Sequence, residues 1–218
     1  MLKTIRSRSD LARAIREVGI LPFFTNGVGG WSVEEHIDPA LWFTEREGPW
    51  EWKGQLASDR TCVYGKFIRN KAAFISPAWF PDLANWRREG LTWEERCSEG
   101  LAPYREQLLM DWLAAHPYAL ARDVKRSVGF SKGFDTALTR LQMQTYVVTA
   151  DFRYSLSKAG IPYGWGNGVI EQADRWLRED ALRLPEDRSP EASFERIVSH
   201  LMSVMPWADE TALRKELK

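Results

Sequence analysis

Polar side chains at helical spacing between residues 132 and 144 make this segment the part of the chain best suited to contact another molecule. Phe134, Leu138 and Leu141 recur at i, i+4 and i+7, and this spacing predicts a helix that buries all three. The outward face then presents Thr136, Thr139, Arg140 and Met143. A guanidinium on that face can pair with a phosphate or hydrogen-bond to guanine, and threonine can contact the backbone or a thymine methyl group.

Further polar and cationic residues extend this face. Lys132 comes directly before the predicted helix, and Arg153 and Lys158 belong to the β-rich run that follows it. Gln142 and Gln144, at the end of the helix, are expected to cap it, to pack against that run or to meet phosphate. We predict that a DNA-binding surface comprises Lys132, Thr136, Thr139, Arg140, Gln142, Gln144, Arg153 and Lys158, with double-stranded DNA as the partner. The alternative is that these are solvated faces of a scaffold used for protein contacts.

Helices and strands in the winged-helix order position these residues. Apolar residues at helical spacing predict helices over 103–116 and 119–126, before the helix described above. A β-rich run from Tyr146 to Phe152 and a returning strand from Pro162 to Ile170 follow it. Three helices and then a β-hairpin predict a winged-helix domain over residues 103–170.

Residues 1–102 are predicted to form a tryptophan-rich α+β region. Ser9 is a suitable cap for a first helix, and Gly19 is a suitable end for it. Residues 21–54 are rich in Gly, Pro and Trp, which favours short strands and loops over a helix.

A β-hairpin and a short helix are predicted next. Runs at 61–67 and 72–75 flank a polar turn, and Ser76-Pro77 is typical of a helix start, followed by Trp79 and Phe80.

The last segment, residues 171–218, is predicted to be helical. One helix should continue from Glu171 to Leu182, a second should begin at Ser189-Pro190 after a charged linker, and a short third should begin near Asp209. The whole chain is thus predicted to be α+β.

Seven of the eleven tryptophans fall between Trp31 and Trp93. Such a cluster favours a large aromatic core or an inter-domain seam. A stacking platform for exposed nucleic-acid bases is the alternative. Sequence alone leaves both open, together with whether this region and the winged helix share one core or have two.

Composition narrows the function classes. The 30 Lys and Arg residues balance the 30 Asp and Glu residues, which counts against non-specific nucleic-acid binding but leaves room for a local basic patch. No apolar stretch is long enough to span a bilayer, and the first residues lack the apolar core of a secretory signal, so the cytoplasm is expected.

No metal or other cofactor is predicted. Cys62 and Cys97 lie far apart, without the spacing of a zinc site or a disulfide framework. Glu34-Glu35-His36 with Asp38 resembles a metal cluster in composition only, because nothing nearby completes a ligand set. Capping and surface roles are expected for these charged residues.

Three groups of segments form a recognisable set: Trp50-Glu51-Trp52-Lys53-Gly54, the run from Cys62 to Phe67 with Ala72 to Ser76 and Trp86 to Arg88, and the run from Gly133 to Val147. In these segments the chain resembles the AlkZ-related proteins, winged-helix relatives of bacterial DNA glycosylases that excise alkylated bases and unhook interstrand crosslinks. The resemblance implies a winged-helix fold and a partner that is DNA.

Those glycosylases hold a catalytic water with a glutamine-x-glutamine or glutamine-x-aspartate motif near the N-terminus. Here the only glutamine-x-glutamine is Gln142-Met143-Gln144, at the end of the predicted recognition helix. The catalytic role is therefore not carried over to this pair, and the catalytic residues stay unknown.

Three hypotheses follow from the sequence. The first is a DNA-binding protein that acts through the helix at 134–143 and the hairpin. The second is a divergent DNA glycosylase whose base pocket lies in the tryptophan-rich half. The third is a protein-interaction module with a winged-helix scaffold.

Overall fold

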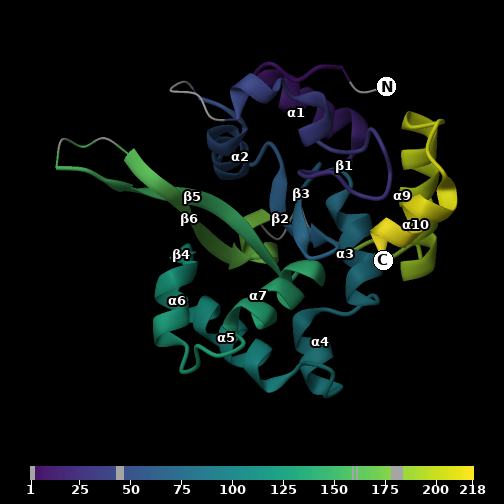
Figure 1. Ribbon diagram of the computed structural model, residues 1–218. Coiled ribbons are helices and arrows are strands. Elements are labelled where there is room, and N and C mark those ends of the chain that lie inside the picture. The colour runs from purple at the N-terminus through teal and green to yellow at the C-terminus, as the bar shows by residue number, and fades with distance from the viewer. Residues whose placement is uncertain (1–2, 43–46, 159, 161, 178–183) are drawn as a thin grey trace.

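A computed structural model describes residues 3–42, 47–158, 160, 162–177 and 184–218. Within them, the strands form two three-stranded antiparallel sheets. The first has the order β1-β3-β2, from β1 (Ile20–Pro22), β2 (Val63–Ile68) and β3 (Lys71–Ile75). The second has the order β4-β6-β5, from β4 (Ala119–Leu120), β5 (Val147–Leu156) and β6 (Pro162–Gln172). Helices surround both sheets (Figure 1), which confirms the α+β class.

Helix α1 (Arg8–Val18) leads directly into β1. Ser7, rather than Ser9, is the N-cap, and its hydroxyl oxygen accepts a hydrogen bond of 3.2 Å from the Asp10 N–H. The prediction of Ser9 was wrong by two residues because Ser7 and Ser9 are both suitable caps before the same apolar stripe. Gly19 ends the helix with φ of 81°, as predicted from its position.

The region from 21 to 54 contains short elements and one full helix. Two 3-10 turns, Glu34–His36 and Pro39–Leu41, agree with the irregular structure that the sequence predicts. Helix α2 (Pro49–Ser58) was not predicted. It begins at a proline, and the Glu51 carboxylate accepts a hydrogen bond of 2.8 Å from the Gly48 N–H. This bond gives the backbone N–H at the helix start a partner.

Strands β2 and β3 form the predicted hairpin, with Tyr64 opposite Phe74. Its turn contains Arg69 and Asn70, both with positive φ. Helix α3 (Phe80–Arg88) begins later than predicted, because residues 77–79 form a turn and Trp79, not Ser76, is the N-cap.

Residues 93–143 form a group of helices below the first sheet (Figure 1). They are α4 (Trp93–Ser98), α5 (Tyr104–Ala115), α6 (Ala121–Ser127) and α7 (Phe134–Met143). Helices α5 and α7 confirm the predictions, whereas α4 was not predicted. Ala119 and Leu120, predicted as the start of the second helix, instead form β4 and pair with β6 at Val169 and Ile170.

The β5–β6 hairpin extends well beyond the rest of the molecule (Figure 1). Val147 lies opposite Gln172 near its base and Leu156 opposite Pro162 near its tip. Both strands are longer than predicted. The first two residues of the helix predicted from Glu171 belong to β6, and α8 (Ala173–Leu177) follows. The rest of that predicted helix lies outside the described residues.

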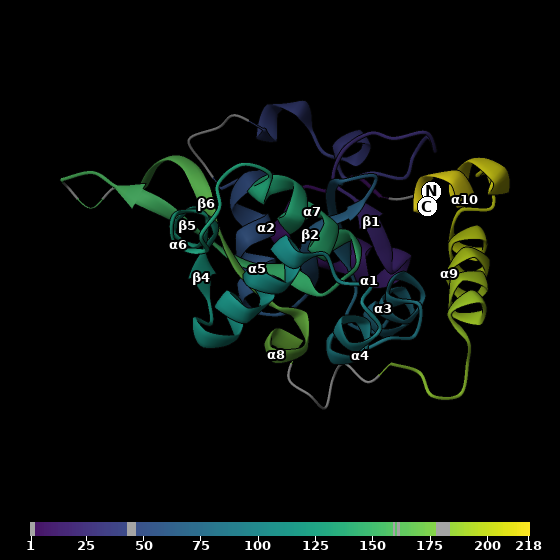
Figure 2. The same cartoon turned by 90° about the horizontal axis from the view of Figure 1, so that it is seen from below.

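Helices α9 (Pro190–Val204) and α10 (Glu210–Leu217) lie at one edge of the molecule, with α9 packed against α3 (Figure 2). Both helices begin where the sequence predicts, and Ser189 and Asp209 are their N-caps. The buried Asp82 carboxylate of α3 holds this contact together, because it accepts hydrogen bonds from both Arg188 and Arg196.

Buried apolar side chains form two clusters. The larger surrounds the first sheet and joins α1, α2, α3 and the C-terminal helices to Val148 and Ala150 of β5. The smaller lies among α5, α6 and α7 and includes Val147 and Ile170. The second sheet therefore contributes to both clusters, and it fixes the position of α7 relative to the first sheet.

Most tryptophans build these cores. Trp31, Trp52 and Trp176 are buried in the larger cluster, and further tryptophans pack against one cluster or the other: Trp42, Trp50, Trp79, Trp86, Trp93 and Trp112. The aromatic-core prediction is confirmed for these residues, since three of them are buried in the larger cluster and the other six are partly buried against one of the two clusters.

Candidate functional site: the face of α7 and the cavity beside it

Helix α7 has an exposed side, a side buried in the smaller core and a side that faces the first sheet. Thr136 and Arg140 are exposed, as is Lys132 in the turn before the helix. Phe134 and Leu141 are buried in the smaller core on the opposite side, as the apolar spacing predicts. The Arg140 side chain is 64% exposed, and its Nη1 lies 3.6 Å from Oε1 of the buried Glu106.

The third side of α7 faces the β2–β3 hairpin. Nζ of Lys66 donates a hydrogen bond of 3.2 Å to the Thr139 hydroxyl, and the Asn70 N–H lies 3.4 Å from Sδ of Met143. Thr139 and Met143 are half-buried. The expectation that both point freely to solvent is wrong, because the first sheet covers this side of the helix.

Gln142 is buried between α7, β2 and β5. Its Oε1 accepts a hydrogen bond of 3.1 Å from the Lys66 N–H, and its Nε2 donates one of 3.0 Å to the Thr149 hydroxyl. Gln144 is the C-cap residue of α7 and is half-buried. The pair therefore sits at the end of the helix, as predicted, but Gln142 is buried, unlike Lys132 and Arg140.

The other two predicted cations lie on the β5–β6 hairpin. Arg153 and Lys158 are both exposed. Arg153 lies opposite Asn167 in the hairpin register, and Lys158 follows the end of β5. Thr136 and Arg140 are thus exposed on α7 and Lys132 on the turn before it, while Arg153 and Lys158 belong to the extended hairpin.

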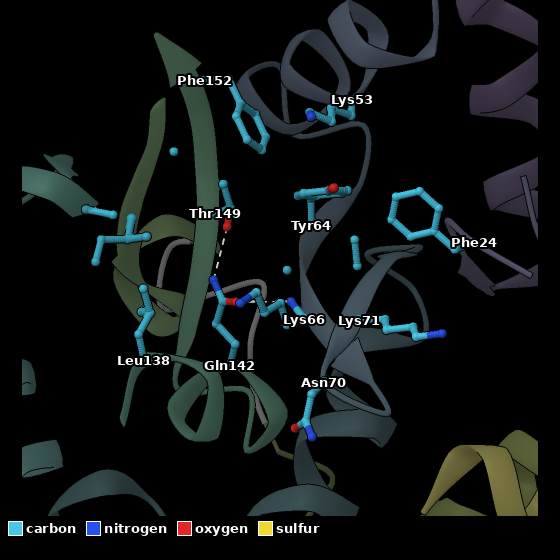
Figure 3. Close-up of a pocket in the computed structure, with 15 residues that line it drawn as sticks. Phe24, Lys53, Tyr64, Lys66, Asn70, Lys71, Leu138, Gln142, Thr149 and Phe152 are labelled. Carbon is cyan, nitrogen blue, oxygen red and sulfur yellow. Dashed lines mark hydrogen bonds between the residues drawn. The ribbon is translucent and has the colours of Figure 1, made fainter. Parts of the chain in front are cut away.

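A cavity of about 640 Å³ opens where α7, the first sheet and the β5–β6 hairpin meet. Figure 3 shows Lys53, Tyr64 and Phe152 at one end of it and Gln142 and Asn70 at the other. Its remaining lining side chains and backbone come from Phe24, Gly65, Lys66, Lys71, Ala72, Ala121, Leu138, Thr149, Gly168 and Ile170. Elements from both halves of the chain are therefore needed to form it.

Aromatic rings form one wall of the cavity. The Tyr64 ring lies 5.0 Å from that of Phe74 and 5.7 Å from that of Phe152, measured between centroids. Burial raises the pKa of the Tyr64 hydroxyl far above its usual range. Tyr64 is therefore a neutral hydrogen-bonding group beside a flat apolar surface.

Lys53 of α2 projects towards this aromatic wall. Its Nζ lies 4.4 Å from the ring centroids of Trp50 and Phe152. Burial lowers the pKa of the Lys53 amine to about 8, and the nearby Glu51 carboxylate opposes this shift. The two other lysines that line the cavity, Lys66 and Lys71, are exposed. The cavity thus combines an aromatic wall with one partly desolvated amine and two solvated cations.

The acidic and histidine residues at 34–38 stabilise their own loop. Glu34 accepts hydrogen bonds from Thr25, and Glu35 accepts them from Ser32 and from the Gly30 N–H. The structural role that the sequence predicts for them is confirmed. Among the described residues, no group of three or more His, Cys, Asp and Glu side chains is placed to hold a metal ion. Those residues also contain no helix long and apolar enough to cross a membrane.

Sequence reasoning missed the cavity residues Lys53, Tyr64, Lys66 and Phe152 as a group. The available signal was the set of segments that carry the family resemblance. Residues 50–54, 62–67 and 133–147 each contribute to the cavity lining, although they are far apart in the chain. In the folded chain these three segments meet at one cavity.

The chain is an α+β protein in which a three-helix and hairpin unit packs against an aromatic-rich sheet, with a cationic and aromatic cavity at the junction. The family model described as AlkZ related matches residues 5–218. The match covers nearly the whole chain, and the protein belongs to the AlkZ-related family. No curated protein matches the sequence, and no solved structure matches the chain.

Proposed function

We propose that the protein binds double-stranded DNA and that residues 103–170 act as a winged helix. The order α5, β4, α6, α7, β5, β6 and the sheet β4-β6-β5 support this assignment. In a winged helix the third helix is presented to the DNA, and here that helix is α7. Membership of the AlkZ-related family supports the same class of partner.

The observation that carries the proposal is the exposure of cations on both expected contact elements. Arg140 is exposed on α7 and Lys132 on the turn before it, and Arg153 and Lys158 are exposed on the β5–β6 hairpin. Cations on a helix and on an adjacent hairpin can neutralise phosphates on both sides of a groove. A local patch of this kind is compatible with a formal net charge of zero.

The packing of α7 limits how the helix can meet DNA. Thr139 is engaged by Lys66 and Gln142 is buried, so neither is free on the outer face. Base contacts would come from the exposed side of the helix, with Thr136 in its first turn and Arg140 in its last turn. Arg140 is already paired with Glu106 at 3.6 Å and would exchange this partner for a phosphate or a guanine.

The test is fluorescence anisotropy of a labelled duplex at roughly 50 and 200 mM salt. We expect a plot of log binding constant against log salt concentration to fall with a slope of several units. At each salt concentration the Arg140→Ala variant should bind more weakly than the wild-type protein. Arg214→Ala is the matched control, because Arg214 pairs with Glu195 and Glu210 on the C-terminal helices. Absence of binding at the lower salt would reject the DNA proposal and favour the protein-interaction alternative.

A divergent DNA glycosylase is the second candidate function. The cavity favours it, because an aromatic wall with nearby amide and hydroxyl groups suits a base extruded from the duplex. Its test is release of a free base from an alkylated duplex, with Gln144→Ala as the variant. If the variant releases the base as the wild-type protein does, Gln144 has no catalytic role. If the wild-type protein releases no base, the glycosylase candidate is rejected and the DNA-binding proposal is unaffected.

A further inference from the structure

The surroundings of Lys53 are typical of a nucleophilic lysine and differ from those of a surface cation. Its side chain leaves α2 to line the cavity, and the rings of Trp50 and Phe152 lie 4.4 Å from Nζ. Within the described residues, Lys53 forms no hydrogen bond or ion pair with a carboxylate. Its amine therefore faces an aromatic wall and an open cavity without a fixed anionic partner.

An amine reacts with a carbonyl only in its neutral form, and desolvation favours that form. Burial lowers the pKa of Lys53 to about 8. About a tenth of a group with that pKa is neutral at pH 7, compared with less than about a thousandth for an ordinary lysine. The cavity thus supplies an amine that is reactive near neutral pH, next to space for a ligand.

The charged surroundings of Lys53 indicate the kind of ligand. Lys66 and Lys71 line the same cavity and remain exposed, so they can bind phosphate groups at its mouth. Besides Lys53, the titratable groups that line this cavity and the neighbouring pocket that shares Phe152 are Glu47, Glu51, Tyr64, Lys66, Lys71, Asp151 and Tyr154. A ligand that carries both an aldehyde and flanking phosphodiesters would match the amine and the two solvated cations.

We propose that Lys53 is an amine nucleophile that forms an imine with the C1′ aldehyde of an abasic deoxyribose in DNA. This inference rests on the proposed DNA binding and adds a covalent activity to it. Nζ of Lys53 adds to the C1′ carbonyl of the ring-opened sugar to give a carbinolamine. Loss of water then forms the C=N bond, with no oxidant, reductant or other reactant, and hydrolysis reverses the step.

The experiment is borohydride trapping with the full-length protein. The probe is a labelled duplex with one abasic site, made by removing a single uracil. Borohydride reduces the imine to a stable secondary amine, so the protein and the labelled strand migrate together on a denaturing gel. We expect an adduct whose cross-linked peptide contains Lys53, and a yield that rises about tenfold per pH unit below the pKa and levels above about pH 8.

Two variants and one altered probe distinguish the nucleophilic role of the Lys53 amine from effects of its positive charge and of misfolding. Lys53→Arg keeps the cation and removes the nucleophile, so the adduct should be lost while duplex binding in anisotropy persists. Lys215→Arg makes the same substitution at an exposed lysine of α10 and should trap as the wild-type protein does. A tetrahydrofuran abasic analogue lacks the aldehyde and should be bound without forming an adduct.

The outcomes distinguish this inference from the proposed function. An adduct that survives Lys53→Arg, or that maps to other lysines, overturns the inference. An abasic duplex that is bound in anisotropy but gives no adduct also overturns it and leaves DNA binding standing. Absence of binding and of trapping at low salt overturns both. Loss of the adduct in Lys53→Arg alone, with a pH midpoint near 8, supports the assignment.

Discussion

The side chain of Gln142 and the backbone N–H of Lys66 are joined by a hydrogen bond of 3.1 Å, although the two residues are 76 positions apart in the chain. The bond ties the end of α7 to the middle of β2. The same amide donates to the Thr149 hydroxyl at 3.0 Å, so one buried side chain connects the helix, the first sheet and the hairpin. These are the three walls of the cavity.

Replacing Gln142 should therefore weaken the junction and not only the helix. Gln142→Leu keeps the volume but leaves the Lys66 N–H and the Thr149 hydroxyl without this partner. Leaving a buried polar group unsatisfied costs about 1–3 kcal/mol, so we expect a loss of about that size in the free energy of unfolding. Urea unfolding measures it. Thr136→Ala, on the exposed side of the same helix, should change stability by less than about 0.5 kcal/mol.

Equal losses of unfolding free energy in the two variants would show that the hydrogen bonds of Gln142 do not contribute to stability. The losses would then reflect helix propensity alone. A loss confined to Gln142→Leu would identify the amide as the link between the two halves.

Local signals in the sequence predicted much of this architecture. Helix α7 follows from three apolar residues on one stripe, and the β2–β3 hairpin follows from two β-rich runs around a polar turn. Helix α2 was missed because residues on several of its sides are buried, among them Trp52, Gly54 and Leu56, so it has no amphipathic pattern.

Features that depend on distant contacts were not predictable in this way. Strand β4 is two residues long, and only its pairing with Val169 and Ile170 makes it a strand. The cavity likewise requires Lys53, Tyr64 and Phe152 to meet across nearly one hundred positions. Periodicity and motif spacing do not show which distant residues meet in space. The segments that carry the family resemblance do, however, contain several of the residues that line the cavity.

Gly19 should be among the glycines least tolerant of substitution. It adopts φ of 81°, and a Cβ there would lie 2.6 Å from Cδ1 of Trp79, whose ring stacks on His200. Gly100 also has positive φ, of 72°, but a Cβ there would meet nothing within 4 Å. We expect Gly100→Ala to cost about 1 kcal/mol from backbone strain alone.

Gly19→Ala should cost about 1–3 kcal/mol more than Gly100→Ala, because the Trp79 ring must also move. Thermal unfolding of the two variants measures the difference. Similar losses at both positions would show that the indole ring moves aside freely.

Glu106 should make stability depend on pH. Burial raises the pKa of its carboxyl above the usual range, against the opposing effect of Arg140 and Arg96. A raised folded-state pKa means that the stabilising contribution is complete below the unfolded pKa of about 4.3, and is lost as pH rises through the folded-state value. Glu106→Gln removes this dependence, because the amide does not ionise.

The free energy of unfolding of Glu106→Gln relative to wild type should therefore increase between pH 4 and pH 7. Denaturant unfolding at several pH values provides the measurement. A difference that stays constant with pH would mean that Arg140, 3.6 Å from the carboxylate, offsets the burial completely.

The hairpin cations provide the most direct test of how the proposed DNA surface is arranged. Arg153 lies on β5 and Lys158 just beyond its end, and both are exposed on the β5–β6 hairpin. If each neutralises one phosphate, replacing both by alanine should reduce the salt-dependence slope by about 1.8, at about 0.9 per contact. The matched control is Lys215→Ala with Lys218→Ala, which makes the same change in net charge on exposed residues at the end of α10. A slope that falls only in the wing variant locates phosphate contacts on the hairpin, whereas equal reductions in both would mean that net charge alone governs binding.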